Sequence, residues 1–460
     1  MTPRTPAVPL ARIGSDAPQL TIPSAPPLTL VREAAPAIPR AGWIPLVSTA
    51  LIVVTSFFAE PTLSDSMTGK VAAGAALKLS LAYKALAPLC DTLDTISQFS
   101  QRQHAAFLVT YVLAFSVWRA LRRNSPAPFR RAARRELAAA IIGLGALLSV
   151  YVVGAMVPRP TAHLVMSSPD DIVVDFHSHT RYSWDGRSAF SPEASRRWHH
   201  ASGFDVAYIT DHSTFAGAEE AAVNNPARAG DGTVMLSGIE VRDRGNHLVV
   251  LGTDGGDWKS YTAGDLQEHV FQRDVAARSV RPVVLLTLPG NLKREREIAM
   301  DGLELSDAAP RGLSQSDAES GTISELARNQ NKSLVASSNN HGWASASPAW
   351  SVMQIPNWRA MTPAQLDLAI RAEILRDGLK AVRVIDRRPP GPVAFAGVAL
   401  TVPDAAWRML KTISWPERVS WLGWIWLSYV LVLAIGRARR TDLREVDSVR
   451  EWKGASALIS

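Results

Sequence analysis

Cysteine is almost absent from this chain. Cys90 is the single cysteine among 460 residues, which excludes both an intrachain disulfide framework and a metal site built on cysteine ligands. Charged residues are also scarce, at 20%, whereas 47% of the residues are hydrophobic. Because the apolar residues are concentrated in a few uninterrupted runs, the composition is typical of a membrane protein that carries a soluble part.

Acidic residues are scarce beside the apolar runs, where arginine gathers. The net charge is +7 and the pI is about 9.7, values that in a soluble protein would suggest nucleic-acid binding. Here the arginines lie in clusters next to the apolar runs, as expected for loops on the cytoplasmic side of a membrane. The charge therefore indicates a lipid bilayer as the partner, and no nucleic acid is expected.

Four apolar segments are expected to cross the membrane, namely residues 43–59, 104–121, 137–157 and 419–436. Each approaches the roughly 20 apolar residues that a bilayer core requires. Residues 71–89 are also apolar on average, but Lys78 and Lys84 interrupt them, so an amphipathic helix at the interface is favoured over a fifth span. Residues 1–40 are rich in Pro, Ala and Thr and lack periodicity, which predicts a disordered tail.

The arginine clusters predict the orientation. The loop from Arg119 to Arg135 and the cluster from Arg437 to Arg440 should both be cytoplasmic. The membrane region 41–157 then places residues 158–415 outside the cytoplasm. Residues 416–460 contain the last span, which crosses back, and a basic cytoplasmic tail. The expected protein is a multi-pass protein of the cell membrane with an extracytoplasmic domain and both termini in the cytoplasm.

The domain at 158–415 has a different pattern from Asp170 onward. Short apolar runs bounded by Gly, Asp and Asn alternate with longer charged amphipathic segments, which is typical of an α/β fold with a parallel sheet. The expected buried strands are Ile172–Phe176, Val206–Thr210, Val234–Ile239, Leu248–Leu251, Val283–Leu288, Leu303–Leu305 and Leu334–Ser337.

Side chains of the metal-ligand type follow several of these strands. The residues are His177 and His179, Asp211 and His212, Glu240, and Asn339 to His341. Because strand ends converge at the face of a sheet where loops build active sites, we expect these side chains to meet. Residues two apart on an extended segment project to one side, so the His-x-His pair can chelate an ion. Glu240 can bridge two cations, and further imidazoles can complete their shells, from His212, His247 and His341.

Other candidate residues receive a more ordinary interpretation. His199 and His200 lie in the helical segment Pro192–Ser202 and are expected on a solvated helix face. Packing in walls and core is the commoner use of tryptophan and is favoured over contact with sugar or lipid for Trp343, Trp350 and Trp358.

The motifs of this region resemble those of the PHP family, the polymerase and histidinol phosphatase metal-dependent phosphoesterases. The similar segments, which follow the family's order within roughly residues 170–345, are Asp175–Thr180, Ser183–Gly186, Gly203–His212, Gly238–Glu240, His247–Gly252, Asp301–Glu304 and Ser338–Gly342. The resemblance implies a distorted (β/α)7 barrel, here inserted between transmembrane α-helices. It also implies divalent metal ions, usually zinc, manganese or iron, at the C-terminal face.

Carried over motif by motif, the resemblance implies three ion positions. The first would be held by His177, His179, Glu240 and Asn339, the second by Glu240 and His247, and the third by Asp185, His212 and His341. Two positions depart from the family: Leu288 stands where a metal-binding histidine is usual, and Asn339 replaces an aspartate. Leucine cannot coordinate a cation, and an amide binds divalent ions more weakly than a carboxylate does. One or two ions, and at most three, are therefore expected.

The expected activity is hydrolysis of a phosphate ester by water that a bound cation activates. His212 and Glu240 are candidate catalytic residues, together with Asp211, which would orient His212 or accept a proton. Arg181 and Arg242 are candidates for binding the phosphate of a small-molecule or envelope substrate. The alternative is a non-catalytic receptor or scaffold that holds a structural metal or a phosphorylated ligand, because two ligand positions are altered.

Overall fold

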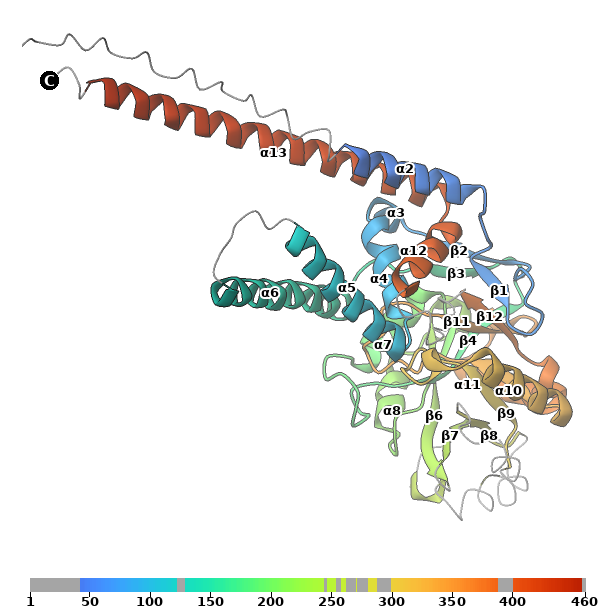
Figure 1. Cartoon of the computed structure of the whole chain (residues 1–460). Coiled ribbons are helices and arrows are strands. Elements are labelled where there is room, and N and C mark those ends of the chain that lie inside the picture. Colours follow the sequence, from blue (N-terminus) through green and yellow to red (C-terminus); the bar gives the residue numbers. More distant parts are fainter. Residues whose placement is uncertain are drawn as a thin grey trace, which may run out of the picture. The chain divides into compact units, whose positions relative to one another are not determined.

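The computed structural model describes residues 42–121, 129–243, 246–253, 258–261, 270, 280–287, 299–387 and 400–456. The expected tail at 1–40 lies outside the described residues, as do Leu288 and part of the arginine-rich loop. Residues Pro45–Ser460 form one unit, in which helices surround a curled sheet (Figure 1).

The sheet is mixed, with the strand order β1-β12-β11-β4-β5-β6-β7-β8-β9-β10. Its strands are β1 (Leu63–Asp65), β4 (Asp171–Ser178), β5 (Val206–Ile209), β6 (Val234–Asp243), β7 (Asn246–Leu251), β8 (Val283–Leu286), β9 (Gly302–Ser306), β10 (Ser333–Ala336), β11 (Ala349–Gln354) and β12 (Arg383–Arg387). The Ser351 hydroxyl of β11 donates to the Ala336 carbonyl oxygen of β10 and accepts from its amide, both at 2.8 Å. This contact brings the last strand of the sheet back beside β11, so the sheet curls.

Each of the seven expected strands is present, but the expected parallel sheet is only partly correct. β4, β5 and β6 are parallel, as are β8, β9 and β10, whereas β7 is antiparallel to both of its neighbours. The link from Asp243 to Asn246 is too short for a parallel crossover, which takes about a dozen residues. β1, β11 and β12 are further strands that the sequence did not indicate, so the sheet has ten strands rather than seven.

The helices around the sheet begin where local sequence signals favour them. They are α7 (Pro192–Ser202), α8 (Ala216–Val223), α10 (Asp317–Gln330), α11 (Pro363–Asp377) and α12 (Thr401–Thr412), with short 3-10 turns η1 (Ala229–Asp231), η2 (Trp258–Tyr261), η5 (Gly312–Ser314), η6 (Trp358–Ala360) and η7 (Gly378–Lys380). Ser316 and Glu319 form a capping box at the start of α10, and Thr362 and Gln365 form one at α11.

Alternating apolar side chains fill the inside of the curl. One buried cluster includes Ile172 and Val174 of β4, and it extends to Trp358, which is only 2% exposed. Trp350 is 1% exposed, so the expectation of core packing holds for both tryptophans. Trp343 is different, because 52% of it is exposed.

The expected amphipathic helix over residues 71–89 is wrong. The segment instead forms β2 (Ala75–Lys78), which pairs with β3 (His163–Met166), followed by α3 (Leu81–Ala85) and the start of α4 (Ala87–Ser97). The Ser80 hydroxyl accepts a hydrogen bond from the Tyr83 amide at 3.0 Å and starts a new helix there. Pro88 lies in the first turn of α4, where it favours a separate helix start. Within this stretch β1 pairs with β12 and β2 pairs with β3, whereas α3 and α4 pack against α13.

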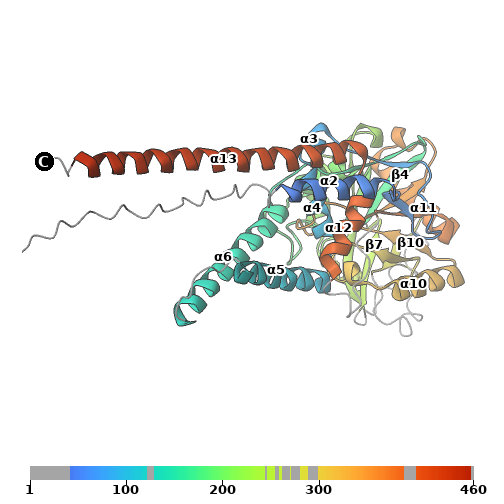
Figure 2. The same cartoon turned by 45° about the horizontal axis from the view of Figure 1, so that its top comes forward.

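Three helices within the described part of the chain are long and apolar enough to cross a membrane. They are α5 (Gln101–Leu121), residues Ala133–Gly154 of α6 (Phe129–Met156), and residues Trp415–Ala438 of α13 (Trp415–Ser456). α5 and α6 lie side by side in Figure 1 and Figure 2. The segment expected as the first span forms α2 (Trp43–Ser56), whose 14 residues extend about 21 Å. It is shorter than the roughly 30 Å core of a bilayer.

Candidate metal centre

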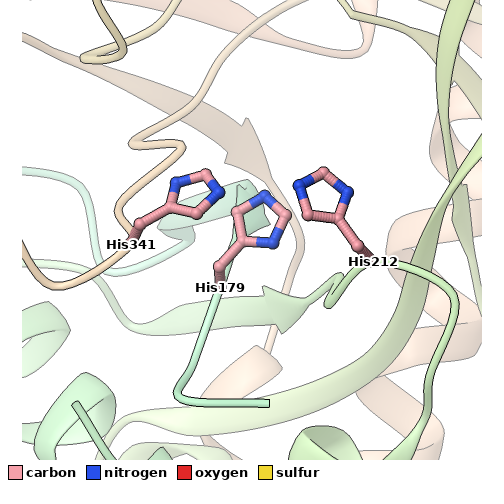
Figure 3. A group of neighbouring side chains, drawn as sticks. All are labelled: His179, His212 and His341. Atoms are coloured by element: carbon pink, nitrogen blue, oxygen red, sulfur yellow. The ribbon is translucent and has the colours of Figure 1, made fainter. Parts of the chain in front are cut away.

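The imidazoles named by the sequence converge at one end of the curled sheet. His177 lies near the end of β4 and His179 just after it, His212 follows β5, His247 is in β7 and His341 lies in the loop after β10. Figure 3 shows the rings of His179, His212 and His341 facing one another from separate loops. The His179 and His341 rings are stacked, with centroids 3.9 Å apart, and the His179 and His212 centroids are 4.7 Å apart.

Glu240 is the hub of the cluster, although it lies within β6 rather than after it. Its Oε2 is 3.0 Å from Nε2 of His177, and 3.2 Å from both Nε2 of His179 and Nδ1 of His212. Its Oε1 contacts Nδ1 of His247. Two ligands of a tetrahedral zinc ion, each about 2.0–2.1 Å from the metal, are themselves about 3.3 Å apart. The spacing around Glu240 therefore suits side chains that share a cation.

Neighbouring groups fix the tautomers of two imidazoles. Nδ1 of His341 is 3.0 Å from the Asn339 carbonyl oxygen, which only accepts, so Nδ1 carries the hydrogen. Nδ1 of His179 is 2.9 Å from the Ser183 hydroxyl, which itself donates to Oδ1 of Asp211, so this Nδ1 is also the donor. Both rings therefore turn an unprotonated Nε2 toward the cluster. Outer hydrogen bonds of this kind orient histidine ligands in metal sites.

Asp211 accepts hydrogen bonds from residues that lie beside His179. Its carboxylate accepts hydrogen bonds from the Thr180 amide and hydroxyl, both at 2.7 Å, and from the Ser183 hydroxyl at 2.9 Å. Burial raises the pKa of Asp211, and these three donors oppose that shift. Its hydrogen bonds thus lead to His179 through Ser183.

Two buried acids that sequence reasoning assigned no role complete the cluster. Oε1 of Glu304, in β9, is 3.2 Å from Nδ1 of His177. Oδ2 of Asp307, directly after β9, accepts from the Asn339 side-chain amide at 2.8 Å. Burial and then the neighbouring Glu304 raise the pKa of Asp307 to about 8. The sequence did contain a signal for Asp307, because it follows a predicted strand and the histidines were identified by that same position.

The charges of the cluster fit a divalent cation. Burial disfavours a proton on His177, but Glu304 and Glu240 outweigh burial and raise its pKa well above the usual value. Burial alone would raise the pKa of Glu240. His177 and the other neighbouring imidazoles lower the pKa by more than burial raises it, so the carboxylate stays ionised. Burial lowers the pKa of His179 well below its usual value. The position between Glu240 and Glu304 thus favours positive charge, which a bound metal ion would supply.

Several buried polar atoms of the cluster also have no hydrogen-bond partner among the described residues. Oδ1 of Asp185, Nε2 of His341, Oδ1 of Asn339 and Oε2 of Glu304 lack a hydrogen bond to any residue that the structure describes. Three groups of side chains place their ligand atoms within 4.8 Å of one another: His177 with His179 and Glu240, His212 with Glu240 and His247, and His179 with His212 and His341. These residues could hold one or more divalent ions, and the chemistry of the donor set fits them.

A cavity of about 360 Å³ opens over the cluster. Its lining consists of Asp185, His212, Glu240, His247, Ala308, Ala309, Pro310, Asn339, Asn340, His341, Trp343 and Ala344. Among the described residues that line it there is no lysine or arginine. Neither arginine expected to bind phosphate is among these lining residues: Arg181 pairs with Glu220 at 3.0 Å on the surface, and Arg242 is exposed on β6, opposite His247.

The expectation for the histidines of α7 is wrong for His199. His200 is exposed, but His199 is completely buried. Nε2 of His199 is 2.8 Å from Oδ2 of Asp175, while Oδ1 of Asp175 accepts from the amides of His177 at 3.2 Å and Ser338 at 2.9 Å. His199 therefore supports the carboxylate that holds the first strand end of the site.

His199→Ala is accordingly expected to lower the free energy of unfolding by about 1–3 kcal/mol, the usual cost of leaving a buried polar group unpaired. Chemical denaturation of the protein in detergent would measure the change. His200→Ala, on the exposed face of the same helix, is the matched control. Equal stability of both variants would show that the contact with Asp175 contributes nothing.

Comparisons with known proteins find only distant likenesses. No protein-family model matches the sequence, and no curated protein is significantly similar to it. A two-domain protein containing a predicted PHP-like metal-dependent phosphoesterase from Bacteroides vulgatus is 14% identical over 43% of this chain and 63% of its own, with a TM-score of 0.27.

Two further solved structures are similar at the same level. A putative metal-dependent phosphoesterase from Bifidobacterium adolescentis is 15% identical over 43% of this chain and 96% of its own, with a TM-score of 0.26. The lesion-specific endonuclease PfuEndoQ from Pyrococcus furiosus is 13% identical over 46% of this chain and 57% of its own, with a TM-score of 0.31. Likenesses of this size carry no conclusion about activity, so the residues of the chain itself must support any function.

Proposed function

We propose that this protein is a membrane-anchored, metal-dependent phosphoesterase. The convergence of four imidazoles on Glu240, with the His341 ring stacked on that of His179, is the principal support, because nitrogen and carboxylate donors about 3 Å apart around one oxygen are the arrangement that a catalytic metal requires. The resemblance of the motifs between Asp175 and Gly342 to the PHP family agrees with it. A divalent cation held there would lower the pKa of water and offset the charge on phosphoryl oxygens.

The chain's own residues then bind, orient and move a proton. His179 and Glu240 would hold one cation together with His177, and the Nε2 atoms of His179 and His341 would offer a further position with His212. Hydrolysis joins a water oxygen to phosphorus and breaks the bond from phosphorus to the leaving oxygen. Oδ1 of Asp185, at the edge of the cavity and 3.2 Å from Nε2 of His341, is positioned to take the proton of that water. The proton balance is completed when the leaving oxygen is protonated.

The lining of the cavity also supports a metal-dependent route. A phosphate ester carries negative charge, yet no lysine or arginine is among the described lining residues. Cations at the imidazoles would supply positive charge at the phosphate.

Purified full-length protein supplemented with manganese, zinc or iron is expected to release phosphate or p-nitrophenol from test esters, whereas His177→Ala should not. A screen across nucleotides, sugar phosphates, lipid phosphates and phosphodiesters would identify the class of substrate. The competing function is a non-catalytic receptor or scaffold with a structural metal. That alternative would be favoured if the unmodified protein bound metal tightly yet released no more product than His177→Ala.

We further propose that the domain lies outside the cytoplasm. The arginine-rich end of the α5–α6 hairpin is opposite to the ends that enter the domain, namely Gln101 of α5 and Met156 of α6, and α13 leaves the domain at Trp415. Arginine on the far side of these helices indicates the cytoplasm there. Arg418 of α13 connects α2 with α12. Its guanidinium donates to the Ile52 carbonyl oxygen of α2 at 2.8 Å and to the Leu410 carbonyl oxygen of α12 at 2.6 Å.

A reporter fusion tests this orientation. Alkaline phosphatase fused after Pro160 is expected to be active, because it needs an extracytoplasmic location, and a fluorescent reporter that folds only in the cytoplasm should be dark at the same position. The opposite pattern at Pro160 would contradict the proposed topology.

A further inference from the structure

The loop that forms one wall of the metal site is joined to the end of a membrane helix. His341 and Trp343 both line the cavity, and the Ser345 hydroxyl donates a hydrogen bond of 2.9 Å to the Gly154 carbonyl oxygen. Gly154 is the last residue of the apolar segment of α6 that is long enough to cross a membrane. The wall at Ala344 is thus one residue, about 3.8 Å of chain, from the contact with the span.

Arg187 makes a second connection between the same two parts. Its amide donates to the His341 carbonyl oxygen at 2.9 Å, and its Nη2 donates to the Met156 carbonyl oxygen at 3.3 Å, at the end of α6. Its guanidinium also lies over the Trp343 ring, 5.7 Å from the centroid. A cation and an indole at the end of a span form the combination that favours the headgroup layer of a bilayer.

A second, neighbouring part of the cavity lining approaches the other helix of the hairpin. Ala308, Ala309 and Pro310 line the cavity, and the chain then enters η5, which packs against α5. Since α5 and α6 are both candidate spans, two walls of the metal site lie against membrane helices.

Exposed aromatic side chains surround this opening. Trp343 is 52% exposed, and Trp184, whose ring lies 5.9 Å from that of His212, is 78% exposed. Large indoles left open to water are unusual in a soluble enzyme, whereas tryptophan is enriched where a protein meets the bilayer surface. The cavity also lacks a described lysine or arginine that could capture a small dissolved anion.

From these contacts we infer that the substrate is a phosphoester anchored in the bilayer, on a lipid or a lipid-linked group, which enters the metal site from the membrane surface between the 308–314 and 339–345 loops. The inference rests on the proposed hydrolysis and specifies its substrate class. The bilayer presents the ester at the opening and keeps its local concentration high, so the protein needs no arginine clamp to collect it.

Paired substrates test the inference. The manganese-loaded full-length protein in nanodiscs should be assayed with long-chain phosphatidic acid in the same discs and with glycerol 3-phosphate in solution. We expect kcat/KM for the bilayer ester to be higher by about 100-fold or more, the scale of gain from presentation at high local concentration. Trp343→Ala should reduce the ratio of lipid to soluble kcat/KM by about 10-fold, whereas Trp415→Ala, which removes an exposed indole at the start of α13 that does not line this cavity, should leave the ratio unchanged.

A second measurement does not depend on activity. Cys90 is buried, so a spin label can be attached selectively at the opening in a Trp343→Cys variant. In nanodiscs the label is expected to collide more often with oxygen, which concentrates in the bilayer, than with a water-soluble nickel complex. A label that collides mainly with nickel, or equal hydrolysis of both esters, would overturn the membrane inference while leaving phosphoesterase activity intact. Hydrolysis of no ester together with an oxygen-accessible label would instead count against the proposed function alone.

Discussion

Glu240→Gln is expected to remove the bound metal and abolish hydrolysis. Oε2 of Glu240 lies within 3.2 Å of nitrogens of His177, His179 and His212, and Oε1 contacts His247. The amide has nearly the same shape, but it carries no charge and one of its two terminal atoms cannot coordinate. The loss of metal affinity should exceed the roughly 10–100-fold that is typical when a residue only supports a ligand.

Metal analysis after dialysis measures this effect, and His200→Ala is the matched control because His200 is exposed on the far end of α7. The control should keep the metal content and activity of the unmodified protein. Retention of metal by Glu240→Gln at the level of the control would mean that Glu240 is not a ligand of the bound metal.

Asp94→Ala is expected to give the largest loss of stability. Asp94 is 1% exposed and pairs with Arg387 through Oδ2 at 2.6 Å, and with Arg159 through Oδ1. The Tyr83 hydroxyl donates to the same carboxylate at 2.9 Å, and burial followed by Asp94 raises the pKa of Tyr83, so the phenol remains a donor. Removal of the carboxylate leaves two largely buried guanidinium groups without it, which costs about 3–5 kcal/mol.

For a domain of this size that loss lowers the Tm by about 10 °C, which can be followed by thermal unfolding in detergent. Asp404→Ala is the control, since Asp404 pairs with Arg408 at 2.9 Å on an exposed helix surface. Exposed pairs of this kind contribute about 0.3–0.5 kcal/mol. Similar Tm values for the two variants would refute the view that Asp94 joins α4 to β12 and to the segment after α6.

Local pattern was sufficient for the seven strands from β4 to β10, and it predicted that several of the clustered histidines would meet. Ile172–Phe176 and the other short apolar runs form strands because each carries its own apolar side chains and turn residues, whatever packs against it. The polar residues after them converge because parallel strands end at one edge, and this rule brought His179, His212 and His341 together without knowledge of the fold. Asp307 also lies shortly after a predicted strand, although the sequence analysis assigned no role to it.

Contacts between distant parts of the chain decided the rest. Residues 71–89 look like one interfacial helix, but pairing of Ala75–Lys78 with His163–Met166 makes the first part a strand. The helical pattern predicts that His199 is exposed to solvent. Its imidazole is instead buried beside the carboxylate of Asp175, which lies 24 positions earlier in the chain.

The sequence by itself therefore determined which residues could form the strands and the metal cluster, since these depend on short-range periodicity. The tertiary structure alone decided that Asp94 meets Arg387, 293 positions away, and that the His341 loop rests on Gly154. Such pairings depend on how the elements pack, because a buried polar group is stable only beside its partner and no local pattern specifies which distant residue that partner is.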